Sequence, residues 1–329
     1  MILKGENMKK ILSLSILLLL SVLYHEIAEA SEDINNYSTS LVYPKYQVDG
    51  VENYFDVLWT PNNSDEFEVV IQNNGNVEIE YAIKINSASL DLSGNVVYTK
   101  KGNENIIHPP FILNENVQME KKVRVPAHSH KSVPGKINFP EEDFNGLLMG
   151  AIVVTPIDNS KQDGINNIVS YSIPIVLRGN IDDRPKSKLS YDSSIIQDIG
   201  SGNILVSNLL NKEAKLLKNT LFKIKVFDEQ KREVWSNEQT LNVVPNALIQ
   251  LAIPIENLKE GSYYLTINVD KDEDHWKFED RFEIDKSIME QKEDNIKKLD
   301  KRIIFLLMGV TIITIIVVIS YKLGKKSRQ

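Results

Sequence analysis

Apolar and polar residues alternate along much of the region between residues 31 and 285. Every second residue from Val77 to Ile85 is apolar, and the same pattern returns in residues 67–71, 222–226 and 265–269. A period of two is typical of a strand that buries one face and leaves the other in water. No stretch of this region has the period of an amphipathic helix, so the pattern predicts an all-β body.

Continuous apolar runs and turn signals refine this prediction. Leu147 to Val154 is apolar throughout and Val169 to Leu177 is mostly apolar, as in strands that are buried on both faces. Turn residues follow the strands closely and predict short connections; they are Asn73-Asn74-Gly75, Ser93-Gly94-Asn95, Val133-Pro134-Gly135 and Glu260-Gly261. Short strands with frequent turns favour two tandem immunoglobulin-like β-sandwiches. Gly179 to Ser187 is polar with Gly and Pro, which places the domain boundary there and gives domains 31–180 and 181–285.

The first 30 residues have the layout of a secretory signal peptide. Met8-Lys9-Lys10 is followed by an apolar run from Ile11 to Leu23, and Ala28-Glu29-Ala30 fits the A-x-A cleavage rule. We expect cleavage between Ala30 and Ser31, with a retained anchor as the alternative. Met8 is an alternative start of translation, because residues 1–7 add nothing to the signal.

The C-terminal region predicts a membrane anchor. Ile303 to Tyr321 contains no charged residue and is long enough for a transmembrane helix. Residues 286–302 are charged and lack Gly and Pro, which favours a short helical stalk, and residues 322–329 form a basic tail. With an export signal at the other end, we expect a single-pass protein of the cell membrane. Its body is then extracellular, next to the cell wall, and its tail is cytoplasmic.

Charge and composition exclude several classes of function. The chain carries a net −7; residues 1–30 are neutral and residues 286–329 carry +6, so −13 falls on residues 31–285. An acidic body argues against nucleic-acid binding. The absence of cysteine excludes a disulfide framework and a thiolate metal site, and the sequence contains no G-x-S-x-G, G-x-G-x-x-G, P-loop or H-E-x-x-H motif.

Three clusters of polar residues have side chains of the types found in catalytic or metal sites. The acidic run from Asp270 to Asp274 predicts a solvated hairpin tip, with a Ca²⁺ site as the alternative. His128 and His130 are candidate metal ligands, but no third ligand lies nearby in the sequence. The sequence therefore does not favour a metal site at these two residues. Glu141 to Asp143 predicts an acidic loop rather than the carboxylate pair of a glycosidase. We therefore expect no catalytic residue, no metal and no cofactor.

Short motifs in the body have an order that suggests a family. Pro44-Lys45-Tyr46-Gln47, Tyr54-Phe55-Asp56-Val57 and the stretch from Phe144 to Ile152 lie in the first block. The second block contains, in order, Asn203 to Asn208, Ala214 to Leu217, Val244-Pro245-Asn246, Gly261-Ser262-Tyr263 and Trp276-Lys277-Phe278. With the two membrane signals, the chain resembles the WxL-interacting protein family of low-GC Gram-positive bacteria.

The resemblance implies a function and candidate contacts. The family combines an N-terminal peptidoglycan-binding domain with a domain that binds a WxL-domain surface protein, which predicts a non-enzymatic, membrane-anchored scaffold that can form part of a complex with host or polysaccharide ligands. The candidate peptidoglycan contacts are Tyr46, Gln47, Tyr54 and Asn145, and the candidate WxL contacts are Asn208, Asn246, Trp276 and Phe278. Trp276 and Phe278 have a second reading as the edge of a sandwich core. Asn246 has a second reading as a turn residue that satisfies local backbone groups. The alternative function is a membrane-anchored hydrolase of wall polysaccharide.

Overall fold

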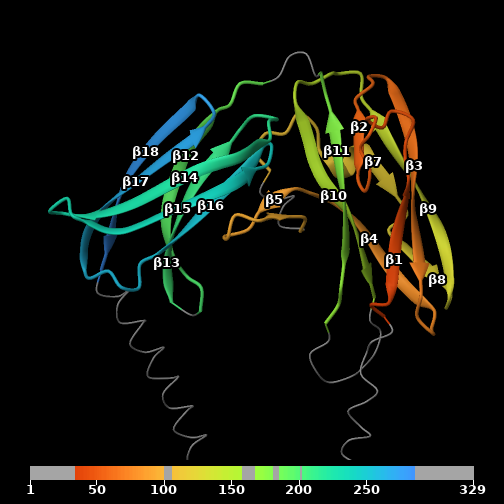
Figure 1. Ribbon diagram of the computed structural model, residues 1–329, viewed down its shortest axis with the longest axis horizontal. Helices are drawn as coiled ribbons and strands as arrows, with labels where there is room; N and C mark the ends of the chain where they lie inside the picture. The colour runs from red at the N-terminus through yellow and green to blue at the C-terminus, as the bar shows by residue number, and fades with distance from the viewer. Residues whose placement is uncertain (1–33, 100–105, 158–166, 181–184, 201, 286–329) are drawn as a thin grey trace, which may run out of the picture. The chain divides into compact units, whose positions relative to one another are not determined.

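The computed structural model describes residues 34–99, 106–157, 167–180, 185–200 and 202–285 (Figure 1). The described chain forms two compact units. Unit 1 contains the described residues within 1–86, 113–143 and 150–177, and unit 2 contains those within 87–112, 144–149 and 178–329. Strands dominate both units, which confirms the predicted all-β class.

Unit 1 is built from two sheets. The order in the first sheet is β1 (Tyr37–Val42), β3 (Asn63–Asn73), β9 (Ser129–Phe139) and β7 (Val117–Met119). The order in the second sheet is β2 (Phe55–Leu58), β11 (Tyr171–Arg178), β10 (Leu147–Pro156), β4 (Ile79–Ser87) and β8 (Lys122–Val125). A one-turn helix, α3 (Leu113–Asn116), precedes β7. The two apolar runs predicted as doubly buried strands are β10 and β11, which lie in the interior of the second sheet.

Aromatic pairs hold the two sheets of unit 1 together. The rings of Phe55 on β2 and Phe67 on β3 are 4.7 Å apart, and those of Tyr37 on β1 and Tyr81 on β4 are 4.9 Å apart. Each pair joins one strand of each sheet, at the separation that aromatic rings favour. The core of unit 1 therefore lies between the sheets, as the alternation of its strands requires.

One predicted turn is wrong. Val133-Pro134-Gly135 lies in the middle of β9 and pairs with β3. The register of β7 with β9 ends at Gly135, so Pro134 lies where β9 has a neighbour on one side only, and this is the position at which a strand tolerates proline. Gly135 lies opposite Phe67, whose ring occupies the space that a side chain would need. Packing, rather than a turn, explains this Pro-Gly pair.

Unit 2 has two larger sheets and a short hairpin. The order in one sheet is β12 (Leu189–Asp198), β13 (Asn203–Asn211) and β16 (Ala247–Pro254). The order in the other is β15 (Glu233–Val243), β14 (Leu217–Asp228), β17 (Gly261–Lys271) and β18 (Asp274–Ile284). Inward residues of both sheets form one apolar core. The hairpin is β5 (Ser89–Leu90) with β6 (Val96–Val97), and Figure 1 shows β5 beside β16.

Segments from the first half of the chain complete unit 2. Ala88 and Leu90 are buried in its core, and Gly94 of the hairpin packs against Leu241 of β15. Ile106 forms a bridge with Ala247, and the Leu147 N–H donates to the Ala214 carbonyl oxygen over 2.7 Å. Unit 2 therefore includes residues 87–99, 106–112 and 144–149, which the sequence-based boundaries assign to the block that ends at residue 180.

Several predictions concern residues outside the described part of the chain. These are the signal peptide with its cleavage site at Ala30 and Ser31, the stalk 286–302, the transmembrane helix 303–321 and the tail 322–329. Among the described residues, no helix is long and apolar enough to cross a membrane.

Candidate functional site

The first group of candidate residues lies at the start of unit 1, in a segment that runs beside β2. The Val48 N–H donates to the Asp56 carbonyl oxygen over 2.7 Å, and the Leu58 N–H donates to that of Tyr46 over 2.9 Å. The Asp65 carboxylate of β3 accepts hydrogen bonds from the N–H groups of Lys45 and Tyr46, at 3.0 and 2.7 Å. A buried carboxylate with several N–H donors fixes the backbone around it. The segment is therefore held on the side of β2 and β3.

Gln47 closes the loop that connects this segment to β2. Its Nε2 donates to the carbonyl oxygens of Val51 and Tyr54, at 3.2 and 3.0 Å, and its Oε1 accepts from the Asp56 N–H at 3.0 Å. All three contacts are to backbone of the same loop. The structure therefore places Gln47 as the residue that shapes the loop, with its amide already engaged on both ends.

Three half-exposed tyrosines surround this loop. The Tyr46 hydroxyl accepts from Asn63 Nδ2 at 2.9 Å, the Tyr54 hydroxyl donates to Asp56 Oδ2 at 3.3 Å, and the Tyr43 hydroxyl accepts from the Asn53 N–H at 2.9 Å. Each ring is held by its hydroxyl and remains partly exposed, and Lys45 Nζ lies 5.1 Å from the centroid of the Tyr46 ring. Such rings can stack on flat, partly apolar ligands such as sugars. Tyr43 was not predicted from the sequence.

Asn145 does not belong to this group. It is exposed and lies in unit 2, where it forms an isolated parallel bridge with Asn180. Three of the four predicted peptidoglycan contacts, Tyr46, Gln47 and Tyr54, are thus together in unit 1, and the fourth is in the other unit.

Asn208 and Asn246, two of the candidate WxL contacts, form hydrogen bonds within unit 2. Asn208 on β13 donates to Ser193 Oγ and accepts from Gln250 Nε2, both at 3.2 Å, so it links neighbouring strands. Asn246 is a turn residue at φ 50°. Its Nδ2 donates to the carbonyl oxygens of Ile107, His108 and Lys212, at 3.2, 3.3 and 3.1 Å. It therefore satisfies distant as well as nearby backbone and fastens residues 106–108 to unit 2.

Trp276 and Phe278 lie at the edge of the core of unit 2, as the second of the two sequence-based interpretations predicts. Both are partly buried and pack against the core of unit 2, where they lie opposite Val269 and Ile267 of β17. The Phe278 ring stacks on that of Tyr191 at 6.3 Å. The acidic run nearby is a hairpin tip, since β17 ends at Lys271 and β18 begins at Asp274. Among the described residues, no group of three or more His, Asp or Glu is placed to hold a metal ion.

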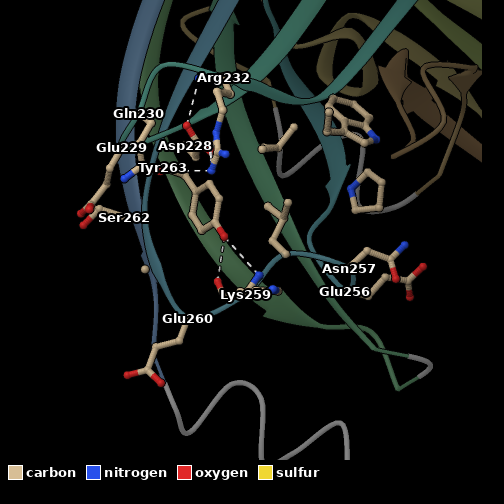
Figure 2. A pocket seen from close by; sticks show the side chains of 15 residues that line it. Asp228, Glu229, Gln230, Arg232, Glu256, Asn257, Lys259, Glu260, Ser262 and Tyr263 are labelled. Atoms are coloured by element: carbon tan, nitrogen blue, oxygen red, sulfur yellow. Dashed lines mark hydrogen bonds and ion pairs between the residues drawn. The ribbon is translucent and has the colours of Figure 1, made fainter.

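Unit 2 contains a groove of about 650 Å³ that none of these four residues lines. Figure 2 shows the turn between β14 and β15 on one side of it and the loop before β17 on the other. Tyr263 fixes that loop, because its hydroxyl donates to the Lys259 carbonyl oxygen at 2.9 Å and accepts from the Lys259 N–H at 3.1 Å. Arg232 fixes the turn through Asp228, to whose Oδ2 its Nε donates at 2.8 Å.

The groove combines apolar walls with a charged rim. Trp235, Val234 and Leu258 supply apolar surface, and Val234 is 41% exposed. The backbone N–H of Arg232, and then its guanidinium, hold the pKa of Asp228 below its usual range, so this carboxylate is ionised and engaged. An aromatic wall with charged edges is typical of a protein-recognition surface. Of its residues, sequence reasoning singled out only the Glu260-Gly261 turn and the Gly261-Ser262-Tyr263 motif.

Comparisons with known proteins identify the family. Residues 37–156 match the model of the WxL Interacting Protein peptidoglycan binding domain, and residues 160–293 match that of the WxL Interacting Protein host binding domain. Both models describe binding domains of one family, and together they cover most of the chain. The chain belongs to the WxL-interacting protein family. No curated protein matches the sequence.

Solved structures give weak likenesses. One is the CsuC-CsuE chaperone-tip adhesion subunit pre-assembly complex from archaic chaperone-usher Csu pili of Acinetobacter baumannii, with a TM-score of 0.33 and 12% identity over 74% of this chain and 97% of that chain. Another is a chaperone-tip adhesin complex of CFA/I fimbriae, with a TM-score of 0.31 and 10% identity over 74% of this chain and 98% of that chain. Similarities at this level do not identify a function.

Proposed function

We propose that the protein is a non-enzymatic, membrane-anchored scaffold of the cell surface, which binds peptidoglycan through its first domain and captures a secreted WxL-domain protein through its second. The observation that carries this proposal is that both halves of the body match binding-domain models of one family. The signal peptide and the helix 303–321 would place the body outside the membrane, next to the wall.

Peptidoglycan binding is assigned to the tyrosine-lined loop of unit 1. Tyr46, Tyr54 and Tyr43 offer ring faces, and Asn63, which is exposed, offers a polar group beside Tyr46. Because the body carries a net −13, anionic wall polymers are repelled in general. Recognition of the glycan at this loop therefore depends on stacking and hydrogen bonds rather than on charge.

The groove of unit 2 is the best-supported place for a protein ligand. Its walls include Val234, which is exposed, and Trp235, which is partly exposed, both on β15 beside the turn after β14. Tryptophan is enriched among the hot spots of protein interfaces. The second candidate function of this unit is binding of a host molecule, which is favoured by the description of the matched model.

The test of wall binding uses the full chain and purified peptidoglycan in a sedimentation assay. Tyr46→Ala and Tyr54→Ala should each lower the retained fraction, whereas Tyr264→Ala, at an exposed tyrosine of unit 2, should not. Thermal melting separates lost contacts from lost folding. Equal retention of all three variants would contradict the assignment to this loop, and failure of the wild type to sediment would contradict wall binding itself.

The test of partner capture uses the same chain with a WxL-domain protein and, in parallel, with host matrix proteins. Trp235→Ala should weaken capture more than tenfold if Trp235 is a hot spot. Trp235 and Trp276 both pack against the core of unit 2, so the melting temperatures of Trp235→Ala and Trp276→Ala must be measured to separate lost contacts from lost folding. If Trp235→Ala weakens the capture of host proteins but not that of the WxL-domain protein, the result favours the second candidate function, binding of a host molecule. Hydrolysis of peptidoglycan by the purified chain would favour the alternative of a wall hydrolase.

A further inference from the structure

A second groove lies in unit 1, at the side of the sandwich away from the strands of the tyrosine-lined loop. Its volume is about 420 Å³, within the range of small-ligand sites. One wall is the last part of β4 and the other is β7, and Lys121 lies where the chain passes from β7 to β8. The groove is therefore the place where the chain leaves one sheet and joins the other.

The wall formed by β4 is an open strand edge. The register of β4 with β8 ends at Ala82 opposite Lys122, and the Ile83 N–H then donates to the Lys121 carbonyl oxygen at 2.8 Å. Successive residues of a strand direct their backbone groups to alternate sides, so the N–H and C=O of Ile85 point to the same side as those of Ile83. Within the described residues no strand pairs with β4 on this side beyond that point. Unpaired strand backbone is a template for another extended chain.

The groove also carries positive charge in an acidic unit. Lys84 and Lys121 line it and are exposed, and neither forms an ion pair within the described part of the chain. By contrast, their neighbours Lys122 and Arg124 both contact Glu80, at 3.6 and 3.3 Å. No described carboxylate lines the groove, whereas Asn114 and Gln118 add amide groups.

We propose that this groove binds the peptide stem of peptidoglycan, as an extended, carboxylate-bearing segment that pairs with the open edge of β4. The backbone of Ile85 supplies the strand-like contacts, and Lys84 and Lys121 receive the carboxylates of the stem. This inference rests on the proposed binding of peptidoglycan and extends it, since the tyrosine-lined loop would take the glycan and the groove the peptide.

The open edge favours a peptide over a phosphate-rich wall polymer. Two lysines alone would attract either anion. A polyol phosphate chain, however, has no amide groups to pair with the backbone of a strand edge, whereas a peptide stem does. The experiment is therefore designed to distinguish binding of the peptide stem from binding of a phosphate polymer.

The experiment measures binding of the full-length protein to a synthetic stem peptide by isothermal titration, and to purified peptidoglycan stripped of wall polymers by sedimentation. The variant Lys84→Gln with Lys121→Gln should weaken binding to the peptide by about tenfold or more, as expected for lost charge-assisted contacts. The matched control, Lys131→Gln with Lys218→Gln, removes the same charge from exposed positions outside the groove and should change binding less than about twofold. A peptide with amidated carboxylates should bind wild type about as weakly as the unmodified peptide binds the groove variant.

The outcomes separate the two proposals. If wild type sediments with peptidoglycan but the groove variant binds the peptide as well as the control does, the groove assignment is overturned and wall binding stands. If the groove variant loses binding only to walls that retain phosphate polymers, the assignment is also overturned, in favour of those polymers. If wild type binds neither peptide nor stripped peptidoglycan, the proposed wall binding fails and the groove assignment fails with it. Melting temperatures should be equal, because both lysines are exposed.

Discussion

Two tyrosines of the unit 1 core differ in how their hydroxyls are satisfied. The Tyr37 hydroxyl lies 2.9 Å from the carbonyl oxygens of Val154 and Val169. The Tyr81 hydroxyl is buried without a hydrogen-bond partner among the described residues. Tyr37→Phe should lower the free energy of unfolding by about 1–2 kcal/mol, because it leaves carbonyl groups unpaired, whereas Tyr81→Phe should be neutral or stabilising. Chemical denaturation of both variants checks this, and an equal loss would contradict the contrast.

The same tyrosines predict how stability depends on alkaline pH. Burial raises the pKa of Tyr81 to about 12 and also raises that of Tyr37. Up to about pH 9 both tyrosines are almost fully protonated in the folded and the unfolded state, so they add no pH dependence. Above about pH 9 the unfolded state loses the protons first, and the free energy of unfolding should fall up to about pH 12. Denaturation between pH 8 and 11.5 should show a shallower fall in Tyr81→Phe than in wild type; identical slopes would exclude Tyr81 as a source.

At the scale of elements, Gly135 of β9 shows packing that overrides a turn signal. An ideal Cβ at this position would lie 2.2 Å from Phe67 Cζ. Gly135→Ala must therefore displace the ring and should lower the free energy of unfolding by about 1–3 kcal/mol. Pro134→Ala changes the exposed neighbour on the same strand and should have a much smaller effect. Thermal melting of the two variants decides the point, since comparable losses would mean that the strand itself, and not the ring contact, is sensitive.

Asn246 should be required to hold residues 106–108 on unit 2. Besides its side-chain contacts, its carbonyl oxygen accepts from the Ile107 N–H at 2.8 Å. Asn246→Gly keeps a residue that tolerates positive φ but removes the amide, and should lower stability by about 1–3 kcal/mol. Asn246→Ala should lower it further, because a side chain with Cβ is disfavoured at φ 50°. Hydrogen exchange at the Ile107 amide is the measurement, and unchanged protection in both variants would rule out this role.

Local patterns predicted the strands well because the period of a strand is itself local. The alternation at 67–71, 222–226 and 265–269 lies in β3, β14 and β17, and Val77 marks a boundary error, since β4 begins at Ile79. The turn at Val133-Pro134-Gly135 was not predictable as a strand because its explanation is Phe67, a residue of another strand. Sequence patterns identify which residues face inward but not which residues face them.

At the scale of the whole molecule, the same limit applies to domains and sites. Tyr46, Gln47 and Tyr54 are close in sequence and come together in one loop, whereas Asn145 belongs to the other unit. The groove residues Lys84 and Lys121 come from separate elements that only the topology brings to one edge. Likewise, a polar linker at 179–187 indicates a boundary, but it cannot indicate that residues 87–112 pack in unit 2.

Unit 2 is built from separate stretches of the chain. A substitution in the first half of the chain should therefore destabilise it. Leu90 is 4% exposed within that core, so Leu90→Ala should lower the free energy of unfolding of unit 2 by about 2–4 kcal/mol. The sequence contains three tryptophans, of which Trp59 lies in unit 1 and Trp235 and Trp276 in unit 2. Fluorescence in a Trp59→Phe background therefore reports on unit 2 alone. Ile71→Ala, in the core of unit 1, is the matched control and should leave that transition in place.

A protease cut within residues 179–187 extends the same argument. The cut leaves Ala88 and Leu90 on the N-terminal piece and most of their core on the C-terminal piece. The sequence alone predicts two independent stable pieces, whereas this core predicts pieces that stay together under native conditions and separate in denaturant. A C-terminal piece that begins at residue 188 should also melt at a lower temperature alone than in the intact chain, since it lacks those buried side chains. Gel filtration of the cleaved protein distinguishes these two predictions. If two folded pieces elute separately, and if Leu90→Ala leaves the unfolding transition of unit 2 unchanged, the segment from the first half of the chain is not needed for the fold of unit 2.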